Sequence, residues 1–243
     1  MAISHPARAA GLMLDHKGLE HRRVDIPTGM QPLVLRAVGF REMTVPAMKI
    51  NGRRVQGSLQ ISRALDEARS EPPLFPADPE RRRAVEEAET WGESVYQPVP
   101  RRIFRWVATR DTRLRAWLAS DAGIPAPAVT ARLSRPMSSW FARSAGADDE
   151  RIKADLRELP AHLDRVDALI AAGTLDGESL NAADFQIATT TRTLLNMPPL
   201  RELVAGRPAE RHAMRISPSF GEEIPLTLPS GFEPAAPAAA PPS

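Results

Sequence analysis

Residues 44–61 have the sequence TVPAMKINGRRVQGSLQI, in which an Asn-Gly pair separates two short β-like runs. Asn-Gly in this setting is the strongest short-range hairpin signal, so we expect strands over residues 45–50 and 53–56. An X-Pro bond can be cis at modest cost, and a proline that opens a strand turns backbone groups outward. Val45-Pro46 is therefore predicted to present the N–H and C=O of Val45 to a ligand.

A helix is predicted to begin near Ser58, with Leu59, Ile61, Ala64 and Leu65 on one face. The unpaired backbone N–H groups of its first turn attract an anion. Together with the strand entrance, they predict a carboxylate-binding corner. The alternative is a hairpin and a capped helix without a ligand.

The N-terminal segment predicts a helix that starts with Pro6 and ends at Gly18, followed by an edge strand over residues 21–26. Ser4 stands at the head of this helix. Its hydroxyl either caps the helix or faces a bound molecule.

These motifs resemble the N-terminal, thioredoxin-like half of cytosolic glutathione transferases. In that family a Val-Pro pair, a hairpin and an acidic residue followed by serine hold glutathione. The resemblance implies glutathione binding by Val45, Pro46 and Ser58, with Gly57 at the position of the usual acidic residue. The pattern Ser-x-Pro-x-Arg-Ala is similar to the serine-type, theta-like branch, which implies that Ser4 donates a hydrogen bond to the glutathione sulfur.

The chain start departs from the family, because only Met1, Ala2 and Ile3 precede Ser4. A thioredoxin-like sheet has a strand before its first helix, and three residues are too few for one. We expect that the N-terminal strand is truncated. The alternative is a degenerate half-domain with a poorly held glutathione site.

Composition limits the classes of function. The 243 residues are 42% hydrophobic and 26% charged, which fits two modest globular domains. No apolar run is long enough for a membrane span and no signal segment is present, so a cytoplasmic protein is expected. The formal net charge of +2 and the mixed charges of the helices do not favour nucleic acid.

Cysteine is absent, which excludes disulfides and the cysteine-type members of the thioredoxin-like group. The five histidines are scattered without the spacing of a metal site, so no metal is expected. The sulfur of any thiol reaction therefore comes from a bound molecule.

The predicted fold class is an α+β thioredoxin-like N-terminal domain, lacking most of its first strand, followed by an all-α helical bundle. We expect a glutathione-binding domain over residues 1–71, a proline-rich linker over 72–79 and a helical domain over 80–216. The last segment, 217–243, is rich in proline and alanine and is predicted to be a disordered tail.

Two motifs lie in the helical domain. Tyr96, Phe104 and Trp106 either pack in its core or line a pocket for an acceptor substrate, as the resemblance implies. Asn181 and Asp184 have the spacing of a capping box at the start of a buried helix.

The resemblance implies a transferase that adds the glutathione thiolate to a small electrophile. A free thiol has a pKa of about 8.5, so such a site must favour the thiolate near neutral pH. Detoxification and a homodimer are implied by resemblance alone. The alternative is a non-catalytic binding or scaffold protein with the transferase fold.

Overall fold

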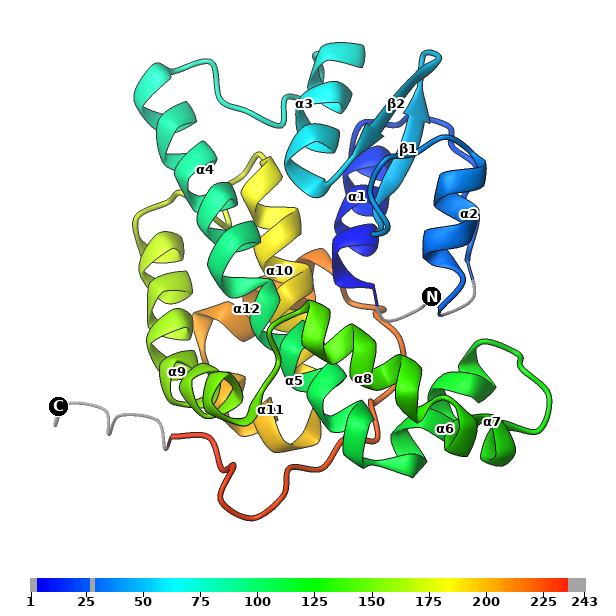
Figure 1. Cartoon of the computed structure of the whole chain (residues 1–243). Helices are drawn as coiled ribbons and strands as arrows, with labels where there is room; N and C mark the ends of the chain where they lie inside the picture. The colour runs from blue at the N-terminus through cyan, green and yellow to red at the C-terminus, as the bar shows by residue number, and fades with distance from the viewer. Residues whose placement is uncertain (1–3, 27–28, 236–243) are drawn as a thin grey trace, which may run out of the picture.

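The computed structural model describes residues 4–26 and 29–235. Helices surround a small hairpin in the N-terminal half of the chain, which is drawn in blue and cyan in Figure 1. In chain order the elements of this half are α1 (His5–His16), α2 (Gln31–Ala37), β1 (Ala47–Ile50), β2 (Arg53–Gln56) and α3 (Ser58–Ala68).

The predicted hairpin is confirmed. β1 pairs antiparallel with β2, and Ile50 lies opposite Arg53 across the turn. Asn51 and Gly52 have φ values of 47° and 80°, the left-handed conformations that a tight two-residue hairpin turn requires. The Val45-Pro46 bond that leads into β1 is cis.

The edge strand predicted over residues 21–26 is wrong. The structure has no strand there, and the side chains of residues 20–25 are exposed. A strand needs a neighbouring backbone to satisfy its N–H and C=O groups, and within the described ranges the hairpin pairs only with itself. Residues 1–3, on which the expected truncation of the first strand depends, lie outside the described residues.

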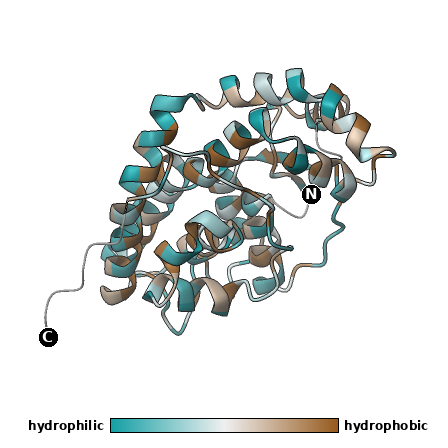
Figure 2. Cartoon of the chain, turned by 90° about the horizontal axis from the view of Figure 1, so that it is seen from below, coloured by the Kyte–Doolittle hydropathy of each residue, from teal (hydrophilic) through white to brown (hydrophobic). Residues whose placement is uncertain are grey.

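The helical half follows the linker and occupies the left side and the lower part of Figure 1. Its elements are α4 (Pro79–Trp91), a π-helical turn η1 (Gly92–Tyr96), α5 (Pro98–Arg110), α6 (Thr112–Asp121), α7 (Pro127–Leu133), α8 (Arg135–Ser144), α9 (Asp149–Ala171), α10 (Ala182–Leu195), α11 (Pro198–Val204) and α12 (Pro208–Ile216). Hydrophobic and hydrophilic residues alternate along most of these helices, as Figure 2 shows. No described helix is long and apolar enough to cross a membrane.

α10 is the central helix and joins the two halves, because it packs against α1 as well as against α4 and α12. The predicted capping box at its start is confirmed. Asn181 Oδ1 accepts from the N–H of Asp184 at 3.3 Å, and Asp184 Oδ2 accepts from the N–H of Asn181 at 2.9 Å. The second Asp184 oxygen contacts His212 Nε2 at 2.8 Å, so this carboxylate is fully used in the core.

The linker and the C-terminal segment both pack on the protein. Leu74 and Phe75 are buried and fix the linker to the core. Residues 217–235, expected to be disordered, instead lie against the helical half, where Ile224 and Leu226 are buried and the Phe232 ring packs on Trp106. Apolar side chains spaced through a proline-rich stretch provide this anchoring. Residues 236–243 lie outside the described residues.

Candidate functional site

A cavity of about 210 Å³ lies between the two halves of the chain. Ser4 and Val45 line it from the N-terminal half, and Arg101, Phe104 and Arg105 line it from α5. Most of the remaining wall is apolar, and α6 and α8 contribute part of it. The described lining contains no Asp or Glu. The structure therefore brings together three of the predicted site residues, Ser4, Val45 and Phe104.

Ser4 occupies the N-cap position of α1, but its side chain makes no capping hydrogen bond. Its backbone carbonyl does accept from the N–H of Arg8 at 2.9 Å. Of the two roles considered for this residue, the geometry thus favours a hydroxyl that faces the cavity over one that caps the helix. A hydroxyl in this position can donate to a sulfur or oxygen atom of a bound molecule.

His5 also lines the cavity and is only 4% exposed. Its Nε2 atom has no hydrogen-bond partner among the described residues. Burial, assisted by the charge of Arg101, lowers the pKa of His5 to about 3. The imidazole is therefore neutral at physiological pH.

Arg101 and Arg105 are the charged groups of the cavity that sequence reasoning missed. They lie four residues apart on α5, a spacing that places both side chains on one face of a helix. The neighbouring Arg102 points elsewhere, because its guanidinium forms two 2.6 Å hydrogen bonds with Asp155. Their i,i+4 spacing could have indicated a shared face of the helix. The mixed charges in the surrounding sequence instead favoured the interpretation of a solvent-exposed face.

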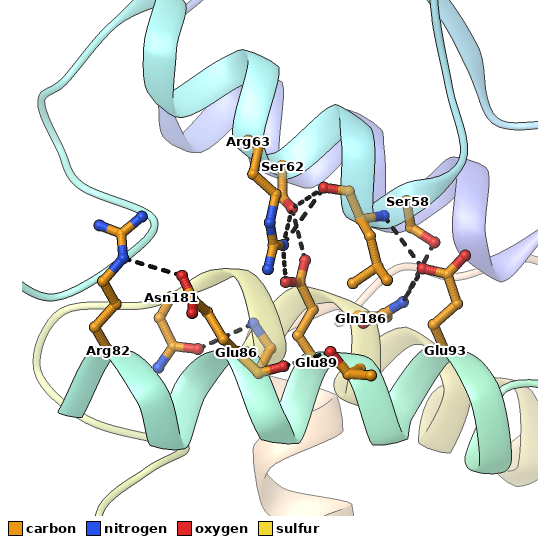
Figure 3. Close-up of polar contacts among 12 residues, drawn as sticks. Ser58, Ser62, Arg63, Arg82, Glu86, Glu89, Glu93, Asn181 and Gln186 are labelled. Atoms are coloured by element: carbon orange, nitrogen blue, oxygen red, sulfur yellow. Dashed lines mark hydrogen bonds and ion pairs between the residues drawn. The ribbon is translucent and has the colours of Figure 1, made fainter. Parts of the chain in front are cut away.

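At the N-terminus of α3, where the carboxylate-binding corner was predicted, the structure places a carboxylate of the chain itself. Glu93, from η1, accepts from the N–H of Leu59 through Oε2 at 3.2 Å. Gln186 of α10 places its Nε2 3.5 Å from the same oxygen and 3.2 Å from Ser58 Oγ. Figure 3 shows the three side chains meeting at the first turn of α3. The corner is therefore closed by an internal contact between the two halves.

Ser58 and Gly57 lie apart from the Ser4 cavity. Ser58 is 2% exposed and does not belong to the described lining. Gly57 is the N-cap of α3 with a φ of 89°, a conformation that an acidic residue adopts only at a cost. Its N–H donates to the carbonyl of Pro46 at 3.0 Å, which ties the corner to the cis peptide bond.

A second carboxylate strengthens the junction between α3 and α4. Glu89 is 1% exposed and accepts from Ser62 Oγ at 2.6 Å, and it also pairs with Arg63. Burial raises the pKa of Glu89, although both partners act in the opposite direction. Figure 3 shows this cluster on the same face of α3 as the Glu93 contact. Glu89 and Glu93 thus both serve the contact between the halves.

The three aromatic residues predicted for an acceptor pocket separate in the structure. Phe104 lines the cavity. Tyr96 is completely buried, with its hydroxyl 3.0 Å from Thr191 Oγ1, and Trp106 donates to Asp149 Oδ1 at 2.8 Å. Neither of these two belongs to the described cavity lining, because each faces the interior of the helical half. The core alternative holds for Tyr96 and Trp106.

Comparison with known families matches residues 1–73 to the N-terminal domain of glutathione S-transferases. No curated protein matches the chain. The match and the structural similarities below support the predicted fold class, a thioredoxin-like domain with a small two-stranded sheet followed by a mostly helical region.

Several solved structures share this fold. A glutathione S-transferase from Rhodospirillum rubrum F11 is 19% identical, with a TM-score of 0.58 over 97% of this chain and 94% of that chain. A glutathione S-transferase from Methylobacterium radiotolerans JCM 2831, solved in complex with glutathione sulfonate, is 20% identical, with a TM-score of 0.55 over 94% and 93%. FzlA from C. crescentus is 16% identical, with a TM-score of 0.54 over 97% and 94%. At these identities the similarity is one of fold.

Proposed function

We propose that this protein is a serine-type, theta-like glutathione transferase, which binds glutathione between its two halves and adds the thiolate to a small electrophile. The observation that carries the proposal is that Ser4 and Val45 line one cavity. The match of residues 1–73 supports glutathione as the bound thiol, as does the neighbour solved with glutathione sulfonate. A cytoplasmic homodimer with a role in detoxification belongs to the same proposal.

The role of Ser4 follows from the acidity of the thiol. A hydrogen bond to a charged group contributes about 1.5–3 kcal/mol, which is enough to lower a thiol pKa by about one to two units. The thiol proton leaves to solvent, and the sulfur electron pair forms the bond to the electrophilic carbon. The displaced electron pair departs with the leaving group, or water protonates it after an addition.

The test compares turnover of glutathione with chlorodinitrobenzene in the unaltered protein and in Ser4→Ala. We expect turnover to fall about tenfold or more, with little change in glutathione affinity, because the hydroxyl acts on the thiolate. Ser138→Ala is a matched control, since Ser138 also lines the cavity but lies on α8. Equal turnover in Ser4→Ala and the unaltered protein would remove Ser4 from the mechanism.

A non-catalytic binding protein with the same fold is the second candidate, and one observation favours it. The corner that would receive the γ-glutamyl carboxylate holds Glu93, and Gly57 replaces the acidic residue beside it. Glutathione that binds at this corner has to displace Glu93. Binding of glutathione without turnover above the uncatalysed rate would favour this candidate.

A further inference from the structure

Two cationic side chains in the cavity have little to bind within the protein. Arg101 has no hydrogen bond or ion pair among the described residues, and Arg105 contacts only Phe141, through its carbonyl at 3.5 Å and its ring at 5.5 Å. A guanidinium group has five N–H donors in a planar fork. Most of these donors are therefore available to a ligand.

Arg115 provides an internal comparison, because it lines the same cavity but each of its three guanidinium nitrogens has an acceptor within the protein. Its guanidinium donates to the carbonyls of Ala131 at 2.6 Å and Ala108 at 2.7 Å, and to Thr112 Oγ1 at 2.9 Å. This arginine is 5% exposed and fixes α6 to its neighbours. The lack of partners at Arg101 and Arg105 is thus a property of these two residues and not of every cavity arginine.

The electrostatics of the pair favour an anion. Burial lowers the pKa of Arg105 to about 10, with Arg101 acting in the same direction, so both remain cationic near neutral pH. Glu93 is the carboxylate that acts on Arg101, but its closest contacts are at the α3 corner. Two like charges four residues apart on one helix repel each other, and a bound anion relieves that repulsion.

We propose that Arg101 and Arg105 form a subsite for the carboxylate of an acceptor substrate whose apolar body lies against Phe104 and Phe141. A guanidinium fork matches a carboxylate in a bidentate geometry, and the aromatic rings and the aliphatic wall suit an apolar group. Ser4 lines the same cavity, so the electrophilic carbon of a substrate held by the arginines can meet the sulfur there. The identification of the ligand as an acceptor substrate rests on the proposed transferase function. The binding of a carboxylate by the two arginines does not depend on that function.

Calorimetric titration with 4-phenylbutyrate and with the neutral 4-phenylbutanamide tests the subsite. The unaltered protein is expected to bind the acid about tenfold or more tightly than the amide, as a charge-assisted hydrogen bond requires. Arg101→Gln and Arg105→Gln are each expected to abolish this preference while the amide binds as before. Arg157→Gln is the matched control, since Arg157 is an exposed arginine of α9 outside the described lining of this cavity.

Equal affinity for acid and amide in the unaltered protein would overturn the subsite. This comparison requires no variant, so it remains valid even if the variants fail to fold. A preference for the acid that survives both substitutions would overturn it as well. The acid titration is repeated with glutathione at saturation. Undiminished binding supports the acceptor subsite, whereas competition would overturn it and assign the arginines to a carboxylate of glutathione itself.

A separate titration with glutathione distinguishes this proposal from the proposed function. Arginine-dependent binding of the acid without any glutathione binding would support a carboxylate site and contradict the transferase. Glutathione binding and turnover without a preference for the acid would support the transferase and contradict the subsite.

Discussion

At the N-terminus of α3, a backbone N–H and the Gln186 amide surround the Glu93 carboxylate, whereas on α5 two guanidinium groups face a cavity whose described lining contains no carboxylate. Both regions suit an anion. In the first, the chain has satisfied the site internally and used it to join its two halves. In the second, charge remains available to a ligand. Whether an anion-binding motif holds a side chain of the protein or a ligand therefore depends on residues that other helices and strands place beside it.

The two regions also differ in chemistry. A helix N-terminus offers partial charges that amount to about half an elementary charge, while each guanidinium carries a full one. The weaker site is closed by a residue from η1, which reaches it from the other half of the protein. The stronger site lies beside Ser4 and Val45, where the proposed chemistry takes place.

Removal of both cavity charges is expected to have the largest effect. Arg101→Gln combined with Arg105→Gln should lower the affinity for 4-phenylbutyrate to that for the neutral amide, a loss of about tenfold or more, because the charge-assisted contacts are lost. The α3 corner should be unaffected, with the same affinity for glutathione as before. Calorimetry measures both affinities. Loss of glutathione binding in the double variant would show that the two regions serve one ligand.

Removal of the Glu93 carboxylate should make the N-terminus of α3 available to a ligand, as the arginine pair on α5 already is. Glu93→Ala frees the N–H of Leu59 and the Gln186 amide, so glutathione affinity is expected to rise about tenfold, as one charge-assisted hydrogen bond allows. Glu87→Ala is the matched control, since Glu87 is an exposed residue of α4. An unchanged or weaker affinity in Glu93→Ala, measured by calorimetry, would mean that glutathione does not use this corner.

Ser58→Ala separates a structural role from a binding role. Because Ser58 is buried against Gln186, its replacement is expected to lower the free energy of unfolding by about 1 kcal/mol, as measured by urea denaturation. Glutathione affinity should remain the same while Glu93 occupies the corner, and should fall only when Ser58→Ala is combined with Glu93→Ala. Ser70→Ala, at an exposed residue, serves as the control. A large loss of affinity in the single variant would show that glutathione already displaces Glu93.

At neutral pH the smallest effect is expected at His5, whose pKa depends on the electrostatic environment of the cavity. Its pKa of about 3 lies below the ordinary value of 6.5, so the unfolded chain binds more protons at this site between those values. Stability is therefore fully present above about pH 6.5 and falls as the pH drops toward 3, by at most about 1.4 kcal/mol per pH unit. His5→Gln should flatten this dependence in thermal unfolding.

Arg101→Gln should raise the pKa of His5 but leave it below 6.5, because burial is the larger cause of the shift. Proton NMR of the imidazole ring measures this pKa directly. Glu87→Gln on the distant surface of α4 is the control. A His5 pKa that does not change in Arg101→Gln would show that the Arg101 charge does not act on the imidazole.

Local rules predicted the parts of the fold that depend on neighbouring residues. The Asn51-Gly52 turn requires residues that adopt left-handed backbone conformations, and the Asn181 cap accepts from the N–H three residues further along the chain. Both could therefore be predicted from the sequence. The strand over residues 21–26 failed because strand formation needs a partner that no local pattern supplies.

The candidate site was predicted only in part for the same reason. Ser4 and Val45 follow from motifs, and the structure places both in one cavity. Glu93 was missed because its contact with Leu59 joins residues 34 positions apart in the chain. Core and pocket stayed open as alternatives for Trp106, because an aromatic residue of a helix suits either one until its neighbours are known.

The most direct test of the proposed function is the ultraviolet absorbance of the glutathione thiolate, recorded at neutral pH with the unaltered protein and with Ser4→Ala at equal occupancy. The account predicts a thiolate band in the unaltered protein and a clearly weaker one in Ser4→Ala. Saturation with glutathione without a thiolate band, or with the same band in both proteins, would contradict it.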